Sequence, residues 1–173
     1  MDIFVEQIIA KRKEPKDLIL SLLISVAVPV LTVAAFVFGL GGISLFVLAG
    51  GCYGAWFLIS GMNVEFEYSV TNGDITVDKI IAKRKRKRLI NLDCKNIESF
   101  GKYESEKFQN RSFDTKLFVG GHPKVPDQWY LTVRHKKLNH TLVVFEPEKR
   151  VLEAIKPFLP KLVANEAFKR FGA

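Results

Sequence analysis

Few side chains in this sequence could carry out covalent or metal chemistry, and they are scattered along the chain. Its two cysteines are Cys52 and Cys94, and its three histidines are His122, His135 and His140. Their spacing matches no metal-binding motif, and the sequence contains neither a glycine-rich phosphate-binding loop nor a nucleophile elbow. We therefore predict a protein that is not an enzyme and that has no catalytic residue, no metal and no cofactor.

The two thiols are expected to stay apart. Cys94 alternates in phase with Ile90 and Leu92, which predicts a buried structural thiol on a strand rather than a reactive one. Cys52 lies in a long apolar stretch, which we assign below to the membrane. No disulfide is therefore expected, as in a reducing compartment.

The most unusual local feature is a run of consecutive basic residues: Lys83, Arg84, Lys85, Arg86, Lys87 and Arg88. Beside a membrane, such a run attracts anionic lipid headgroups by about 1 kcal/mol per residue. Other interpretations are a solvated hairpin tip whose charge prevents edge pairing between sheets, or a contact with nucleic acid or an acidic protein. We favour the binding of anionic lipid and expect no nucleic-acid partner.

The charge distribution indicates where the membrane would be. The chain has 173 residues and a formal net charge of +8, yet none of the 47 residues from 18 to 64 is charged. One helix of that length would be about 70 Å long, whereas a bilayer core is about 30 Å thick and needs about 20 residues per helix. Gly39-Leu40-Gly41-Gly42 offers a break, so we predict a transmembrane hairpin over 18–62, with helices at about 18–38 and 43–61.

Two alternatives to a membrane hairpin were weighed. A helical hairpin buried in a soluble protein would normally keep a polar face, and this stretch has none. A cleaved signal peptide has a shorter apolar region and is not followed at once by a second apolar span. We therefore interpret the stretch as an uncleaved membrane anchor.

The positions of Lys and Arg predict the topology of the hairpin. Four lie in the N-terminal tail, none lies in the glycine-rich loop, and the basic run follows the second span. By the positive-inside rule, both termini then face the cytoplasm of a two-span cell-membrane protein. Gly50 and Gly54 predict close helix packing, either between the two spans or between protomers; the equal alternative is that they reflect only the general enrichment of glycine in membrane spans. Neither span has a charged side chain, which argues against a transporter or channel.

Residues 1–17 form a tail before the hairpin. Its apolar residues recur at helical spacing, namely Met1, Phe4, Val5, Ile8 and Ile9. This periodicity predicts an amphipathic helix. Because basic residues and a membrane span follow, the helix could lie on the cytoplasmic membrane surface; packing of its apolar side on the C-terminal domain is an equal alternative.

Residues 63–173 hold the whole net charge, with 22 Lys and Arg against 14 Asp and Glu. Residues 64–70 alternate apolar and polar, Asn72-Gly73 predicts a two-residue hairpin turn, and further strands are expected on either side of the basic run. Residues 101–127 are irregular apart from a short strand at 116–119. Strands at 129–133 and 141–145, a helix from 148 to about 156, and a second short helix complete the domain.

These residues carry a resemblance to known families. Residues 68–100, with the Asn72-Gly73 turn, the basic run and the segment 90–99, resemble the opening hairpins of bacterial pleckstrin-homology-like (PH-like) domains. The whole chain is also similar to a family of small bacterial two-span membrane proteins of unknown function, most recognisably at 64–89 and 135–160. The resemblance implies an α+β fold, in which the transmembrane hairpin precedes a small antiparallel PH-like β domain with a C-terminal helix. It supplies no catalytic residue.

We therefore expect a non-enzymatic membrane-anchored scaffold or adaptor, whose cytoplasmic PH-like domain binds anionic lipid headgroups or a partner protein. The alternative is an accessory subunit of a larger membrane complex, assembled through the transmembrane hairpin. A homo-oligomer formed through the same hairpin is also compatible with the sequence.

Overall fold

The computed structural model describes residues 2–122 and 127–169 and divides into two compact units. The helical unit comprises Arg12–Val64 and Ile81–Lys85. The sheet unit comprises Met1–Lys11, Glu65–Ile80 and Arg86–Ala173.

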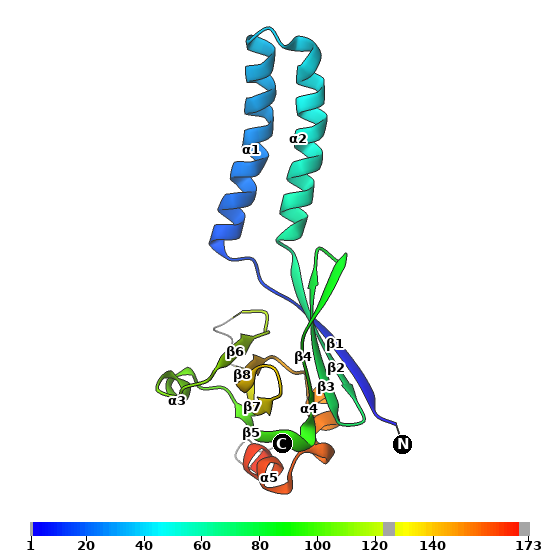
Figure 1. Ribbon diagram of the computed structural model, residues 1–173, viewed down its shortest axis with the longest axis vertical. Coiled ribbons are helices and arrows are strands. Elements are labelled where there is room, and N and C mark those ends of the chain that lie inside the picture. Colours follow the sequence, from blue (N-terminus) through cyan, green and yellow to red (C-terminus); the bar gives the residue numbers. More distant parts are fainter. Residues whose placement is uncertain (1, 123–126, 170–173) are drawn as a thin grey trace. The chain divides into compact units, whose positions relative to one another are not determined.

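The helical unit contains two long helices side by side, α1 (Pro15–Val37) and α2 (Gly41–Gly61) (Figure 1). Pro15 suits the first turn of α1, and a capping box joins Glu14 and Asp17, in which the Glu14 N–H donates to Asp17 Oδ2 at 3.0 Å. Gly39, at φ +78°, lies in the connection. Both helices are long and apolar enough to cross a membrane, and no residue of either is buried. Their bounds lie close to those predicted from the sequence.

The two helices touch along one stripe each. Half-buried positions recur every three or four residues, at Ser21, Ile24, Val28 and Thr32 on α1 and at Ser44, Val47 and Gly51 on α2. This spacing keeps one face of each helix toward the other. Most of the remaining apolar side chains are exposed, whereas Ala34, Ala35, Ala55 and Ile59 are half-buried.

The sheet unit holds two four-stranded sheets in the described part of the chain. In the first sheet the strands lie in the order β1-β2-β3-β4. These strands are β1 (Phe4–Ala10), β2 (Val64–Thr71), β3 (Asp74–Ile81) and β4 (Lys85–Asp93). In the second sheet the strands lie in the order β5-β7-β8-β6. These strands are β5 (Ile97–Lys102), β7 (Trp129–His135), β8 (Asn139–Phe145) and β6 (Thr115–Phe118). A 3₁₀ turn, η1 (Cys94–Asn96), connects β4 to β5.

The prediction of a small antiparallel β domain is confirmed, with one parallel pair among its strands. β6 runs parallel to β8, whereas β1–β2, β5–β7 and β7–β8 are antiparallel. β6 and β8 are not consecutive, because β7 lies between them in sequence, so no hairpin forces their directions to oppose. The irregular segment that leads to β6 also contains a short helix, α3 (Ser105–Gln109), which the sequence pattern did not predict.

Strands are followed by helices, as predicted. α4 (Lys149–Ile155), the 3₁₀ turn η2 (Lys156–Phe158) and α5 (Lys161–Lys169) end the described chain. Val151 and Ile155 of α4 are fully buried. Phe168 of α5 stacks on Phe100 of β5, with ring centroids 6.1 Å apart. The fold is therefore α+β, with a C-terminal helical layer on the sheet unit.

The prediction of an N-terminal amphipathic helix is wrong. Residues Phe4–Ala10 form the edge strand β1, which pairs antiparallel with β2 so that Val5 faces Val70 and Ile9 faces Phe66. The strand period of two was hidden because Gln7, the central residue on the core-facing side, is polar. Its burial, at 3% exposure, and the β-branched residues around it fit a strand. The tail thus packs on the C-terminal domain, which therefore begins before the hairpin.

Two local predictions are confirmed. Asn72 and Gly73 both have positive φ, at 50° and 94°, as a type I′ hairpin turn requires. Cys94 is buried as predicted, at 0% exposure, although it lies in η1 just after β4 rather than on a strand. Burial raises the pKa of its thiol to about 12, with the charges of Asp93 and Asp74 adding to the shift. Such a thiol is structural rather than nucleophilic.

Candidate functional site

The basic run begins in the tight turn between β3 and β4. Ala82 and Lys83 have φ of 54° and 57°, and the Arg84 N–H donates to the Ile81 carbonyl at 3.0 Å, which defines a type I′ turn. The Ala82 N–H donates to the carbonyl of Asn63 at 2.8 Å, so the turn is bonded to the chain just after α2. Only the first two residues of the run lie in the turn, because β4 already begins at Lys85.

Arg84 packs onto the end of α2 within the helical unit. Its guanidinium carbon lies 5.0 Å from the ring centroid of Trp56 and 4.9 Å from that of Phe57. Its Nη2 also donates to Ser60 Oγ at 2.8 Å. Positions 56, 57 and 60 are neighbours on one helix face, so they form a seat for a planar cation. Trp56 is about one and a half turns of helix from the end of α2.

The helical unit gathers its charges at one end. Six cations lie where α1 begins and α2 ends; we call them the basic collar, and they are Arg12, Lys13, Lys16, Lys83, Arg84 and Lys85. Two acidic residues accompany them, Glu14 and Asp17, so this end carries a net charge of +4. The opposite end, at residues 38–40, has no charge. The unit is therefore an apolar helix pair with one cationic end.

The second half of the basic run has a different role in the sheet unit. Arg86 Nη2 donates to Glu67 Oε2 at 2.5 Å, and Arg88 Nε donates to Asp78 Oδ1 at 3.1 Å. Both carboxylates are buried, at 5% and 4% exposure. Burial raises the pKa of Glu67 above its ordinary value, and the charge of Arg86 opposes that shift. These two arginines stabilise carboxylates in the sheet.

The structure thus divides a run that the sequence presented as one site. The three arginines each have a partner within their own unit, and they stand at every second position. In the described part of the chain no ion pair is recorded for Lys85 or Lys87, both of which are exposed. The alternation of Arg and Lys was visible in the sequence, and strand periodicity could have suggested two different roles.

The glycines of α2 differ in what surrounds them. A Cβ on Gly51 would lie 2.9 Å from Val28 Cγ1, so α1 and α2 approach closely at Gly51. A Cβ on Gly50 or Gly54 would meet nothing within 4 Å. The close approach between the two helices therefore uses Gly51, and Gly50 and Gly54 do not take part in it. Their surfaces are available for the other alternative, packing between protomers.

A buried polar network that sequence reasoning missed lies in the sheet unit. Gln7 joins β1 to the segment before α4, since its Nε2 donates to the Glu146 carbonyl at 3.0 Å and its Oε1 accepts the Glu148 N–H at 2.8 Å. The Tyr68 hydroxyl donates to the Val119 carbonyl at 2.5 Å, and burial raises the pKa of this phenol. These bonds satisfy polar groups deep in the unit, so we assign them to stability.

Glu146 extends this network to the loop after β6. Its Oε1 accepts the backbone N–H of His122 at 3.3 Å and Nε2 of Gln128 at 3.2 Å. A Cβ on Gly120 would lie 2.5 Å from the same oxygen. The carboxylate of Glu146 therefore bonds to residues on both sides of this loop, a role that no local sequence pattern indicated.

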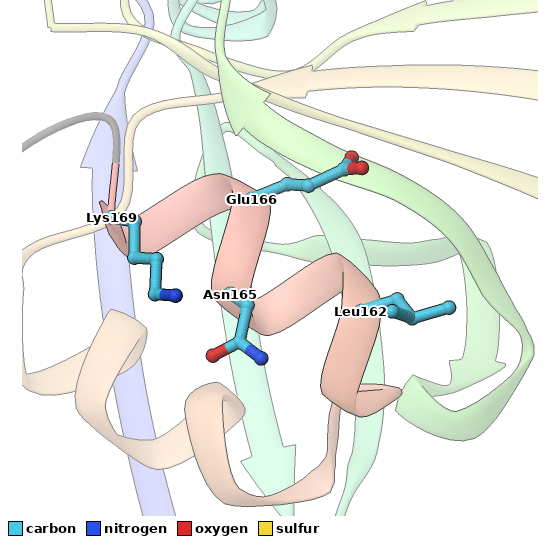
Figure 2. A pocket seen from close by; sticks show the side chains of 4 residues that line it. All are labelled: Leu162, Asn165, Glu166 and Lys169. Atoms are coloured by element: carbon cyan, nitrogen blue, oxygen red, sulfur yellow. The ribbon is translucent and has the colours of Figure 1, made fainter.

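The surface of the sheet unit has a hollow along its last helix. Figure 2 shows this hollow beside α5, where Leu162, Asn165, Glu166 and Lys169 project from a single helix. Leu162 is 80% exposed there, so this surface is open to solvent. In residues 2–122 and 127–169, no group of three or more His, Cys, Asp or Glu side chains is arranged to hold a metal ion.

Comparison with known proteins gives one family. The family described as Bacterial PH-like domain (DUF6106) matches residues 1–165. The match includes β1, the helix pair, both sheets and most of α5. No curated protein and no solved structure matches the chain.

Proposed function

The chain belongs to the bacterial PH-like domain family DUF6106, and from this premise we propose that it is a membrane-anchored binding module whose basic collar contacts anionic lipid headgroups. The helix pair is its anchor in the cell membrane, with both termini in the cytoplasm. The PH-like sheet unit is then tethered beside the lipid surface, where it is available to a partner protein. The module has no catalytic role in this proposal.

The observation that carries the proposal is the seat of Arg84 on Trp56, Phe57 and Ser60. Tryptophan rings favour the boundary between lipid and water, and a long basic side chain there keeps its charged group at headgroup level. The other five cations of the collar lie at the same end of the helical unit, and the opposite end is uncharged. This asymmetry supports a cytoplasmic collar under the positive-inside rule.

In this proposal the lipid-binding residues are those of the basic collar, and no longer the whole run from Lys83 to Arg88. Arg86 and Arg88 are engaged by buried carboxylates, so their charges are largely compensated. Lys83, Arg84 and Lys85 belong to the helical unit and add to Arg12, Lys13 and Lys16. Lys16 is paired with Glu14 at 2.7 Å, so its charge is partly compensated. At about 1 kcal/mol per residue near an anionic surface, each of the other collar residues would contribute about a fivefold preference for anionic over neutral lipid.

The test uses the full chain, because β1 belongs to the sheet unit and a fragment from residue 63 would lack it. The chain is placed in nanodiscs of phosphatidylcholine with phosphatidylglycerol, and the lipids that stay bound are identified by native mass spectrometry. We expect enrichment of phosphatidylglycerol at low salt and a loss of that enrichment in a variant with Lys83, Arg84 and Lys85 all changed to Gln.

The matched control removes the same charge elsewhere. Lys149, Arg150 and Lys161 are exposed on the helical layer of the sheet unit, and their joint change to Gln should leave the enrichment unchanged. Equal enrichment in the native chain and in the variant at positions 83–85 would overturn the lipid proposal. An equal loss in both triple variants would also overturn it, since net charge alone would then explain the effect.

A second candidate function is an accessory subunit assembled through the helices. It is favoured by the open surfaces at Gly50 and Gly54, where a neighbouring helix could approach closely. Changing both glycines to Leu should then release a copurifying subunit or a second copy during purification in mild detergent. Unchanged mass and composition of the purified particle would contradict this candidate.

A further inference from the structure

A hollow of about 280 Å³ opens in the sheet unit between the end of β4 and the turn that joins β7 to β8. One wall comes from the segment that includes Asn91, Asp93 and Asn96, and the other from the segment 133–137. Both walls belong to the sheet unit, and none of the collar residues takes part. The proposed lipid contact therefore leaves this hollow unassigned.

Two apolar residues are among those that line the hollow. Leu92 and Val133 line it and are 5% and 2% exposed, so their side chains belong to the core and hold the two walls in place. Its volume lies near the lower end of the range for small-molecule sites, about 300–1,000 Å³. A ligand of a few heavy atoms beyond its charged group would fill it.

Hydrogen-bond donors converge on the walls. Asn91 Oδ1 accepts the Thr76 hydroxyl at 3.3 Å, which leaves the amide NH₂ of Asn91 to donate. His135 Nδ1 accepts the backbone N–H of Lys137 at 3.2 Å, so the neutral imidazole carries its proton on Nε2 and is a second donor. Lys136 and Lys137 add two ammonium groups.

The charge at the hollow is positive. In the described part of the chain, no ion pair is recorded for Lys136 or Lys137, and both are exposed. Arg134 donates to Glu98 at 3.0 Å, and Asp93 Oδ1 accepts the N–H of Lys95 at 2.9 Å, so these two groups are each already engaged. The Asp93 carboxylate keeps its negative charge, since a backbone N–H does not neutralise it, so Lys136 and Lys137 leave a net charge of about +1 at the hollow.

We infer that this hollow binds a small phosphate monoester. A phosphate monoester carries close to two negative charges at neutral pH and presents three acceptor oxygens, which matches two ammonium groups together with an amide and an imidazole donor. A carboxylate offers two oxygens and would therefore leave more of these donors without an acceptor from the ligand.

The phosphate monoester has two possible sources, a soluble metabolite or the headgroup of phosphatidic acid. Glycerol 3-phosphate is the probe for the first source and is titrated into the full chain in neutral detergent by calorimetry. Nanodiscs with phosphatidic acid in phosphatidylcholine are the probe for the second. They hold the variant with Lys83, Arg84 and Lys85 changed to Gln, so that these collar residues do not contribute, and the bound lipid is read by native mass spectrometry. Binding in either arm supports the site and identifies its source.

The variants Lys136→Gln and Lys137→Gln should each weaken binding about tenfold, because each removes one charge-assisted hydrogen bond. The charge-preserving variants Lys136→Arg and Lys137→Arg should retain binding within about threefold. The control, Lys149→Gln with Lys161→Gln, removes the same charge from exposed positions and should leave binding unchanged. Thermal unfolding of the double glutamine variant should match that of the native chain, since both lysines are exposed.

Two results would overturn the inference. One is the absence of both glycerol 3-phosphate binding at millimolar concentration and phosphatidic acid enrichment. The other is binding that survives the double variant at positions 136 and 137. The triple variant at positions 83–85 should not alter the affinity for glycerol 3-phosphate, so failure of the collar and failure of this site are distinguishable.

Discussion

Replacing Arg86 by Gln should destabilise the sheet unit, although Arg86 lies in a run of exposed basic residues. The side chain of Glu67 is 6% exposed and that of Arg86 is 57% exposed, so the variant leaves a buried carboxylate without its counter-charge. Loss of a hydrogen bond to a charged group costs about 1.5–3 kcal/mol. Because water reaches the arginine side, we expect about 1.5 kcal/mol, which lowers the unfolding midpoint by roughly 5 °C for a unit of this size.

The effect of this substitution should depend on pH. The folded pKa of Glu67 is raised above its ordinary value of 4.5, so the folded state binds more protons than the unfolded state between those two values. Stability therefore falls as pH rises through that window. Without Arg86 the folded pKa rises further, so the cost of Arg86→Gln should be small near pH 4, where Glu67 is protonated in both states, and should reach its full size above the raised pKa.

The assay is thermal unfolding of the full chain in neutral detergent at several pH values. The fluorescence of Trp129, which is 6% exposed on β7, reports the sheet unit once Trp56 is replaced by Phe. Lys87→Gln is the matched control, since it removes the same charge at the neighbouring exposed position. Equal midpoints for the variants at 86 and 87, or a cost of Arg86→Gln that does not change with pH, would refute the role given to Arg86.

Three further predictions follow from contacts in the structure. Gly120→Ala should cost about 1–3 kcal/mol, because the new Cβ would displace the carboxylate of Glu146; an unchanged unfolding midpoint would contradict this. With Cys52 changed to Ser, Cys94 should react with a maleimide at pH 8 only after unfolding, since a pKa of about 12 leaves about one thiolate in ten thousand; rapid labelling of the folded chain would contradict it. Gly51→Leu should lower the unfolding midpoint of the helix pair, read by Trp56 fluorescence, more than Gly54→Leu, and the reverse order would show that the contact with Val28 is not decisive.

Local signals in the sequence were sufficient for several elements. The helix pair follows from 47 residues without a charge and a glycine-rich break, since backbone groups in lipid must be paired within a helix. The turn at Asn72-Gly73 follows from the ease with which those residues adopt positive φ. Burial of Cys94 follows from its phase with Ile90 and Leu92. Each of these depends on neighbours close in the chain.

The N-terminal strand shows where local pattern fails. Phe4, Val5, Ile8 and Ile9 fit a helical period as well as a strand, and the choice depends on β2, whose pairing partners lie about sixty residues away. Gln7 could be buried only because the backbone of Glu146 and Glu148 meets both ends of its amide. Neither the pairing with β2 nor the hydrogen bonds of Gln7 can be predicted from the sequence near residue 7.

For the basic run, the sequence and the tertiary structure determine different properties. The sequence by itself determined that six cations follow the second apolar span and that a long-range electrostatic role is available to them. Only the tertiary structure decided which charges are compensated. Glu67 and Asp78 lie 19 and 10 residues before Arg86 and Arg88 in sequence, and the folded sheet unit brings each carboxylate into contact with its arginine. Charge is a property of composition, whereas its neutralisation depends on distances that folding creates.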